Sequence, residues 1–180
     1  NIVGKVADQA VKAVQKLGPL DIKMIAPSHG LVWRSNLHWV LDRYVKWSTG
    51  ENEEGVVIVY GSMYGNTALM ADIIARGVSE AGVKNIKIYD VAKTEVSHII
   101  SDIWKYKGAI IGACAHYGSV FPNMTLLLHE LTEFKPKNKI YGVFGGMSWG
   151  GGGVKYINNV MEKNQWECPV ESVEVKGAPY

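Results

Sequence analysis

The chain has 180 residues and a mass of 19.8 kDa, the length of one ordinary domain or of one domain with part of another. Its 47% of hydrophobic and 20% of charged residues exclude a disordered chain, and no run approaches the roughly 18 consecutive apolar residues of a membrane-spanning helix. A net charge of +2, from 19 basic and 17 acidic residues, is too balanced for a nucleic-acid-binding protein.

The first 50 residues predict too little structure for a complete domain. Their apolar periodicity indicates a helix over 3–17, a short strand over 22–26 and a second helix over 33–47. One strand and two helices cannot bury a core alone, so we expect residues 1–50 to be the end of a larger domain whose main part lies upstream. Residues 51–55 are polar and acidic, as is typical of a linker.

From residue 56 onward, strand and helix patterns alternate regularly. Strands are predicted over 56–60, 86–91, 109–113, 140–144 and 170–175, and a helix is predicted in each of the four intervals between them. This alternation indicates an α/β fold with a parallel, doubly wound sheet. The second and fifth strands contain charged residues, as edge strands do, which favours the flavodoxin-like order 2-1-3-4-5. A closing helix is missing after the fifth strand, which we interpret as a truncation.

Three glycine-rich loops follow the first, third and fourth strands, where ligands bind in such sheets. The first loop, 61–67, precedes a helix and offers Ser62, Asn66 and Thr67 but no Lys. It matches neither a Walker loop nor a dinucleotide fingerprint, and it suits a monophosphate that backbone amides and hydroxyls would bind. The alternative is that these three side chains simply cap the helix.

The second loop, 114–122, and the third, 145–153, add planar side chains beside glycines. Tyr117 and Trp149, with Tyr64 or Phe121, could enclose a flat ring system. A ring between aromatic walls with a phosphate at a helix N-terminus describes FMN.

Two of these loops and one upstream segment resemble a known family. Residues 61–67, Gly-Ser-Met-Tyr-Gly-Asn-Thr, resemble the phosphate loop of flavodoxins and, more closely, that of flavodiiron proteins; residues 147–153 are similar to that family's third flavin loop. Residues 25–33, Ile-Ala-Pro-Ser-His-Gly-Leu-Val-Trp, are similar to the last segment of its metallo-β-lactamase-like domain. The resemblance covers nearly the whole chain.

This resemblance implies two domains and two cofactors. Residues 1–50 would end a metallo-β-lactamase-like αββα domain, and 56–180 would be a flavodoxin-like FMN domain. His29 would be one ligand of a non-haem diiron centre whose other ligands lie outside this chain. The residues expected to bind FMN are Ser62, Met63, Tyr64, Gly65, Asn66, Thr67, Ala115, His116, Tyr117, Gly118, Ser119, Gly146, Met147, Ser148, Trp149 and Gly150.

The implied function is an electron relay in an oxidoreductase. FMN would accept electrons from rubredoxin or a reduced deazaflavin coenzyme, and the diiron centre would reduce dioxygen to water or nitric oxide to nitrous oxide. The implied partners are the rest of the diiron domain and a second copy in a head-to-tail homodimer, with no nucleic acid, no membrane and no catalytic residue in this chain. The alternatives are a flavodoxin-type electron carrier and an empty docking domain.

Two further expectations concern the cysteines and the charge near the flavin. Cys114 and Cys168 form neither a disulfide framework nor a metal site alone, so we expect a cytoplasmic protein, with Cys114 a small buried apolar residue. The second and third loops contain no Asp or Glu but do contain His116, so a negatively charged reduced flavin should be tolerated there. The alternative is that Glu51, Glu53 and Glu54 fold back and supply negative charge.

Overall fold

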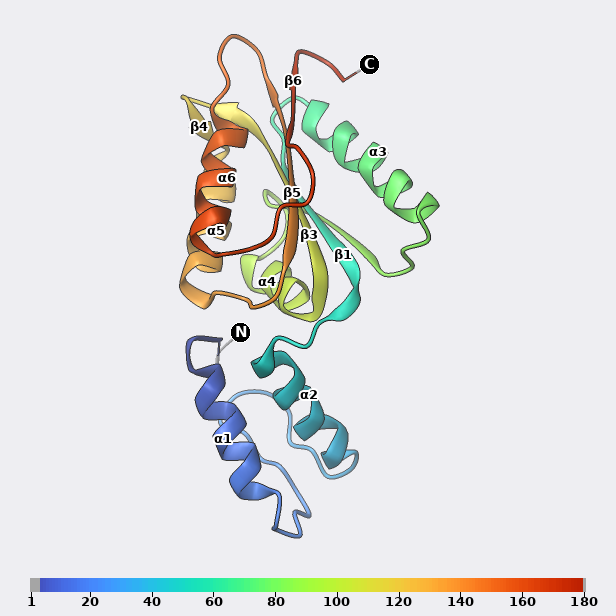
Figure 1. Cartoon of the computed structure of the whole chain (residues 1–180), viewed down its shortest axis with the longest axis vertical. Coiled ribbons are helices and arrows are strands. Elements are labelled where there is room, and N and C mark those ends of the chain that lie inside the picture. Colours follow the sequence, from blue (N-terminus) through green and yellow to red (C-terminus); the bar gives the residue numbers. More distant parts are fainter. Residues whose placement is uncertain (1–3, 180) are drawn as a thin grey trace. The chain divides into compact units, whose positions relative to one another are not determined.

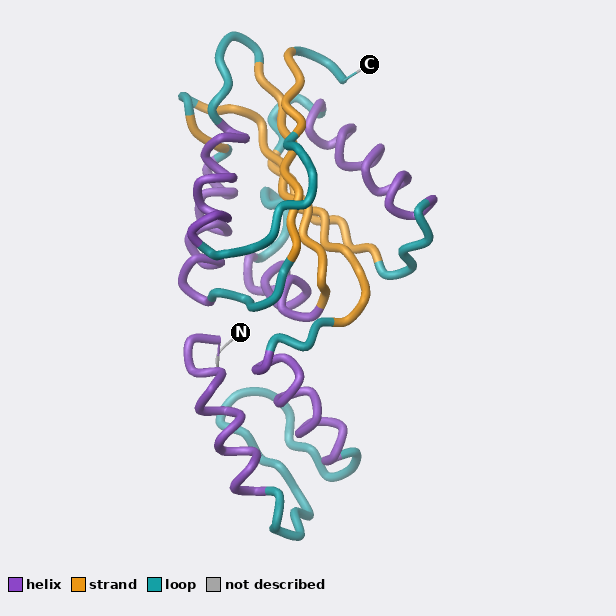
Figure 2. Tube along the Cα trace, viewed as in Figure 1, coloured by secondary structure: helices purple, strands orange, loops and turns teal. Residues whose placement is uncertain are grey.

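The computed structural model describes residues 4–179 and divides them into two compact units, one up to Glu51 and one from Asn52 onward. Each unit is described by itself below. Figure 1 labels the elements, and Figure 2 separates helices, strands and loops by colour. Among residues 4–179, none of the helices has the length and apolar character needed to cross a membrane.

The smaller unit consists of two helices and a long connection. A 3-10 turn, Gly4–Val6, leads into α1 (Ala7–Leu17), so the predicted helix over 3–17 is α-helical only from Ala7, and residue 3 lies outside the described range. The predicted strand over 22–26 is wrong, because only the isolated antiparallel bridge between Ile25 and Trp33 forms.

The second helix of this unit, α2 (Leu37–Thr49), begins four residues later than predicted. Trp33 donates its N–H to Ile25 O and accepts from Ile25 N, at 2.8 and 2.9 Å, so its backbone groups are engaged in the bridge instead of a helix.

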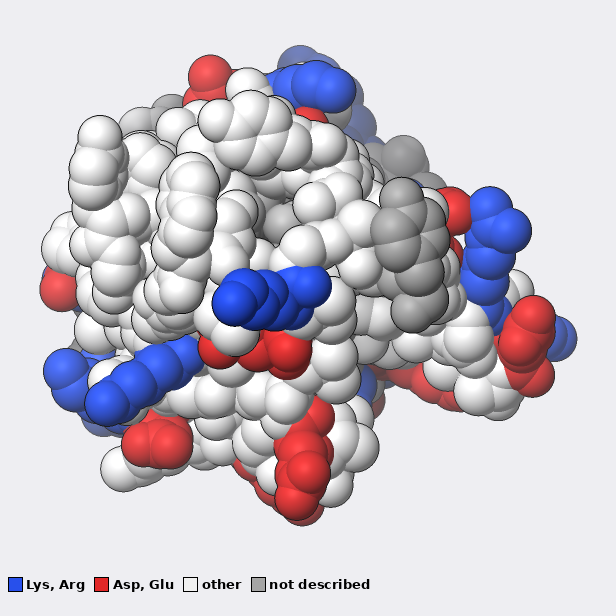
Figure 3. Space-filling view, turned by 90° about the horizontal axis from the view of Figure 1, so that it is seen from above, with Lys and Arg blue, Asp and Glu red and all other residues white. Residues whose placement is uncertain are grey.

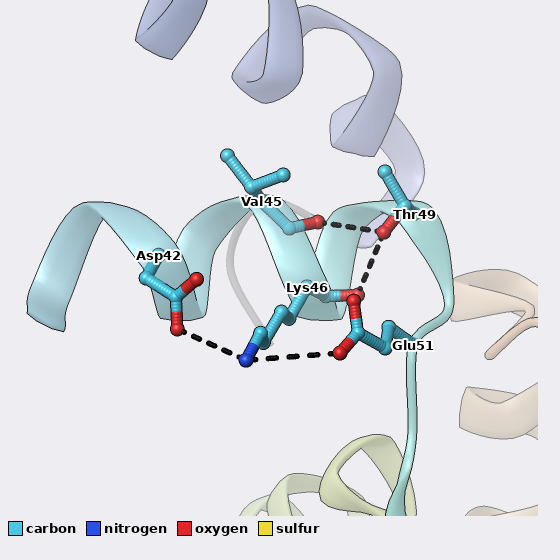
Figure 4. A network of polar contacts seen from close by, with 5 residues as sticks. All are labelled: Asp42, Val45, Lys46, Thr49 and Glu51. Carbon is cyan, nitrogen blue, oxygen red and sulfur yellow. Dashed lines mark hydrogen bonds and ion pairs between the residues drawn. The ribbon is translucent and has the colours of Figure 1, made fainter.

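Polar contacts stabilise the end of α2 (Figure 4). The Thr49 hydroxyl donates to Val45 O at 3.0 Å, and Lys46 Nζ lies 3.3 Å from Asp42 and 3.7 Å from Glu51. The helix stops at Gly50, whose φ of 78° is left-handed. Glu51 is therefore already paired within this unit.

The larger unit is built on a parallel sheet with the strand order β2-β1-β3-β5-β6. Its strands are β1 (Glu53–Gly61), β2 (Ile86–Asp90), β3 (Tyr106–His116), β5 (Ile140–Met147) and β6 (Val173–Lys176). In the sequence-based numbering this is the order 2-1-3-4-5, so the predicted fold and both predicted edge strands are confirmed. A sixth strand, β4 (Ser119–Val120), pairs antiparallel with the end of β3.

The first strand begins inside the predicted linker. Glu53 already pairs with Tyr106, and the register shifts between Glu53 and Val56. Gly55 lies in this irregular stretch, and a Cβ placed on it would lie 2.4 Å from the Tyr106 ring. Gly55 therefore permits a close approach of two strands within the segment that was predicted to be a linker.

Helices cover the two faces of the sheet unequally (Figure 1). The helix α3 (Asn66–Glu80) packs on one face over a small core that includes Ile58 and Phe144. The helices α4 (Val96–Lys105), α5 (Pro122–Phe134) and α6 (Gly153–Lys163) share a larger core on the other face. All four predicted helices of this unit are thus present.

A buried lysine joins three elements at the amino end of the sheet. Lys139 is 3% exposed, and its Nζ donates to Tyr106 O at 2.7 Å, to Trp104 O at 3.1 Å and to the side chain of Asn52. Burial, and secondarily the charge of Lys107, lowers the pKa of Lys139 to about 7.

Candidate functional site

The first loop leaves the N-terminus of α3 open to a ligand. The residue before α3, Gly65, has a φ of 91°, which favours glycine, and it donates its N–H to Ser62 Oγ at 3.1 Å. No side chain of the described residues caps α3, and its first turn has no acidic residue. The alternative of simple helix capping is therefore wrong, and the free first-turn amides can serve an anion.

The first two residues of α3, Asn66 and Thr67, lie in different environments. Thr67 is buried, with 1% of its surface exposed. The Asn66 side-chain amide donates to Gly177 O at 3.3 Å, and Gly177 N donates to Met147 O at 2.9 Å. The first and third loops are therefore connected through the segment that follows β6.

The second loop is a tight hairpin that the sequence pattern did not reveal. His116 pairs with Ser119, and the two residues between them, Tyr117 and Gly118, have φ values of 49° and 73°. Two positive φ values are characteristic of a two-residue hairpin turn. Tyr117 is 97% exposed at its tip, with its ring centroid 4.5 Å from that of His116.

The third loop connects β5 to α6 and contacts this hairpin through backbone atoms. A Cβ placed on Gly152, which has a φ of 120°, would lie only 2.5 Å from Gly118 O. Glycine is needed here both for the conformation and for the close approach. Trp149, in the same loop, is 98% exposed.

A small hollow of about 60 Å³ opens between the three loops. The lining residues that the sequence predicted are Ser62, Met63, Tyr64, Asn66, Thr67, Ala115, Gly146, Met147 and Ser148. The other predicted residues lie in the adjoining turns and strand ends: Gly65, His116, Tyr117, Gly118, Ser119, Trp149 and Gly150. The structure thus brings the three predicted segments together at one end of the sheet.

Two lining residues were absent from the predicted set, Cys114 and Gly177. Cys114 is half-buried and lines the hollow, so the expectation of a small buried residue is wrong. Burial raises the pKa of its thiol. Gly177 follows the fifth strand of the parallel sheet. This position could have predicted Gly177 as a lining residue, because the loops that follow parallel strands all emerge at the same edge of the sheet.

The size of the hollow and the exposure of the aromatic residues divide the site into two parts. The hollow suits a phosphate-sized group, because it is far smaller than the roughly 300–1,000 Å³ of a typical small-molecule pocket. Tyr64, Tyr117 and Trp149, each at least 88% exposed, offer faces to a planar ring at the surface. Figure 3 views this end of the sheet, where white, uncharged side chains project beside several Lys, Arg, Asp and Glu side chains.

A carboxylate lies against the third loop, although the loop itself contains no Asp or Glu. Glu174, opposite Gly145 in the β5–β6 pairing, has both carboxylate oxygens within 2.9 Å of where a Gly151 Cβ would stand. The prediction rested on the residues of the loops alone, whereas this carboxylate comes from the edge strand β6. Glu53 and Glu54 begin β1 at the opposite end of the sheet, so they do not supply the charge.

The predicted metal ligand, His29, lies in an exposed turn of the smaller unit. Within residues 4–179, no three His, Cys, Asp or Glu side chains are grouped so that they could bind a metal ion. The assignment of His29 to a diiron centre stays a prediction.

Comparison with known proteins agrees with this architecture. The sequence profile of the family described as Flavodoxin matches residues 58–179. The chain belongs to the flavodoxin family. It is also 32% identical over 161 residues to a protein of Escherichia coli (strain K12 / DH10B) named anaerobic nitric oxide reductase flavorubredoxin, a match that covers 89% of this chain and 33% of that protein. The chain therefore spans about a third of the length of such curated relatives.

Solved structures show the same relationship. Rubredoxin oxygen:oxidoreductase from Desulfovibrio gigas superimposes with a TM-score of 0.90 at 27% identity, over 99% of this chain and 45% of that one. A flavodiiron protein from Giardia intestinalis has the same fold, with a TM-score of 0.91 at 20% identity over 99% of this chain and 44% of its own. The resemblance of this flavodoxin-family chain to flavodiiron proteins is confirmed.

Proposed function

We propose that this chain contains the FMN-binding, electron-relay part of a flavodiiron oxidoreductase. The observation that supports this most directly is the convergence of three loops on the uncapped N-terminus of α3, beside exposed aromatic side chains. Membership of the flavodoxin family and the flavorubredoxin relative point to the same function.

The residues present fit FMN. The first amides of α3 would bind the phosphate together with the hydroxyls of Ser62 and Thr67, in a site without an acidic residue in the first helical turn. The faces of Tyr64, Tyr117 and Trp149 would contact the ring. When bound, FMN would supply the ability to exchange electrons one or two at a time.

The proposed electron route runs from a donor, such as rubredoxin or a reduced deazaflavin coenzyme, through this domain to a diiron centre. His29 would provide one iron ligand, and the rest of the diiron domain and a head-to-tail homodimer would complete the enzyme. The relatives are named for nitric oxide and for oxygen, so either is proposed as the substrate. Cys114 and Cys168 are free thiols, which fits the proposed cytoplasmic location.

A flavin titration of the full chain tests the proposal. FMN should bind and lose its fluorescence, and riboflavin, which lacks the phosphate, should bind at least about tenfold more weakly, because hydrogen bonds to a charged group contribute roughly 1.5–3 kcal/mol each. An absence of FMN binding would contradict the proposal, and equal affinity for the two flavins would contradict the phosphate site.

A second measurement separates the relay from the alternatives. FMN binding by itself excludes the empty docking domain but is shared with a flavodoxin-type electron carrier. A protein that also contains the complete diiron domain should bind iron and consume dioxygen or nitric oxide when reduced rubredoxin is supplied. Reduction of the flavin without consumption of either gas, in an iron-loaded protein, would favour the carrier.

A further inference from the structure

The boundary between the two compact units falls between two neighbouring residues. Glu51 belongs to the smaller unit: its N–H donates to Lys46 O at 2.8 Å, and its carboxylate lies 3.7 Å from Lys46 Nζ (Figure 4). Asn52 belongs to the larger unit, and its side-chain amide donates to Lys137 O at 3.3 Å and to Asn138 O at 3.1 Å. The connection between the units therefore contains no unattached residue while Asn52 stays bound.

The attachment of Asn52 also involves a buried cation. Lys139 Nζ donates to the side-chain oxygen of Asn52 and to the backbone carbonyls of Trp104 and Tyr106. These three acceptors match the three N–H bonds of an ammonium group, but all three are neutral. In the part of the chain that the structure describes, no carboxylate pairs with Lys139, and the neighbouring charge that affects its pKa is the cation Lys107. A buried charge without an opposite partner is unfavourable.

The charged and titratable side chains on the surrounding elements do not compensate this cation. They are Lys105 on α4, Tyr106 and Lys107 on β3, Glu53 and Glu54 on β1, Lys135 and Lys137 before β5, and Glu167 in the bridge to Ile140. Glu53 lies 3.8 Å from Lys105, whereas Glu54 and Glu167 are exposed to water, which screens their charge. Lys139 is therefore more easily protonated in water than in its buried site, in agreement with the lowering of its pKa to about 7.

The segment attached to Lys139 is the least regular part of β1. Glu53 pairs with Tyr106, but the register then shifts, and pairing with β2 begins only at Val56. Residues 52–55 are thus paired with one neighbouring strand, whereas β1 has a strand on both sides from Val56 onward. Segments with few backbone hydrogen bonds open locally at a lower free energy than the core of a sheet. Opening of residues 52–55 would remove Asn52 from Lys139 and admit water to the ammonium group.

We propose that Lys139 and Asn52 form a proton-sensitive hinge between the two units, in which protonation of Lys139 favours detachment of residues 52–55 from the sheet. Burial lowers the pKa of Lys139, and exposure to water restores it, so the open state binds the proton more tightly. Opening should therefore become more frequent as the pH falls from about 10 toward 7. Four released residues would add up to about 14 Å of extended chain to the connection. This inference does not depend on the proposed FMN function.

Hydrogen exchange of the full chain, without added flavin, measures this opening at pH 6 and pH 9. After correction for the pH dependence of chemical exchange, the amides of residues 53–56 should be at least about tenfold more protected at pH 9 than at pH 6, because linkage to one proton allows up to about tenfold per pH unit. At each pH these amides should be less protected than those of residues 109–113 in the central strand β3. Equal protection of the two segments would mean that residues 53–56 open only when the whole unit unfolds, and the hinge would be excluded.

Two variants test the role of the charge. Lys139→Met removes the titrating group, so the ratio of protection at pH 9 to protection at pH 6 should fall to about one. Asn52→Asp keeps Lys139 and places a carboxylate at its acceptor, which should raise the pKa of Lys139 in the closed state and also reduce the ratio. Asn85→Asp is the matched control, because Asn85 donates to Glu54 O at 3.0 Å in the same segment, and this variant should retain the native ratio.

The ratios decide the inference. A native ratio near one, or a native ratio that persists in Lys139→Met, would overturn it. A ratio that falls in Asn85→Asp as much as in Asn52→Asp would also overturn it, because the pH dependence would then not depend on a charge beside Lys139.

Discussion

At the scale of single residues, Ser62 and Thr67 provide the hydroxyls of the candidate phosphate site in different environments. Ser62 is half-buried, and its hydroxyl accepts a hydrogen bond from the Gly65 N–H within the turn. Thr67 is buried one position into α3, and a Cβ on Gly146 would lie 3.7 Å from its Oγ1. Thr67 is therefore fixed by packing, whereas Ser62 is fixed by the turn.

Removal of either hydroxyl should weaken FMN binding. Thr67→Ala and Ser62→Ala each delete a possible hydrogen bond to a charged group, so each should reduce the FMN affinity by roughly 1.5–3 kcal/mol, about ten- to a hundredfold. Fluorescence titration measures this directly. Ser79→Ala, near the other end of the same helix, is the matched control and should leave the affinity unchanged. Native affinity in the Ser62→Ala, Thr67→Ala double variant would place the phosphate elsewhere.

At the scale of secondary-structure elements, Lys139 connects the end of α4, the start of β3 and the residue before β1. Its ammonium group donates hydrogen bonds to the backbone carbonyls of Trp104 and Tyr106, at the C-terminus of α4. Carbonyls at a helix C-terminus have no hydrogen-bond partner within the helix, so Lys139 supplies one. Burial disfavours the charged ammonium group more than these hydrogen bonds favour it, because desolvation is the main cause of the lowered pKa of Lys139.

This lowered pKa predicts how stability changes with pH. The pKa is about 7 in the folded chain against 10.5 for an unperturbed Lys, so between these values the unfolded chain binds more protons. The contribution of Lys139 to the free energy of unfolding should therefore increase from neutral pH to about pH 10, with a slope of at most about 1.4 kcal/mol per pH unit.

Urea unfolding across this interval measures the effect. In Lys139→Met the rise with pH should become shallower than in the native chain. Lys84→Met removes an exposed lysine that precedes β2 and should keep the native slope. Parallel curves for the native chain and Lys139→Met would show that Lys139 keeps an ordinary pKa.

At the scale of the whole molecule, the candidate FMN site lies within a single unit. Every residue that lines the hollow belongs to the unit that starts at Asn52, and this unit contains both hydrophobic cores of the sheet. The smaller unit exposes many large apolar side chains, among them Leu20, Met24, Leu31 and Trp39. We therefore expect the larger unit to fold without the smaller one.

A fragment of residues 52–180 should retain the flavin site. Its FMN affinity should match that of the full chain within about twofold, because groups without shared contacts usually contribute independently. Circular dichroism and flavin titration of the purified fragment test this. A folded fragment with a much lower affinity would mean that the smaller unit contributes to the site.

The sequence by itself determined the sheet order and the three loops that meet at one end of the sheet. Continuous apolar runs such as 109–113 predict central strands, and charged residues such as Lys87 and Glu174 predict edge strands. This pattern depends only on the residues within each strand, so it does not require exact strand boundaries. The candidate phosphate loop was equally readable, since its glycines and hydroxyls all lie within residues 61–67, between a strand and a helix.

Only the tertiary structure decided the features that depend on pairing between distant segments. The hairpin at Tyr117 follows from the pairing of His116 with Ser119, and the clash that makes Gly152 necessary involves Gly118. Glu174 lies 23 residues after Gly151 in the sequence, yet its carboxylate lies against that glycine because β6 pairs with β5. Charge near a site depends on distance in space, and residue spacing along the chain does not report it.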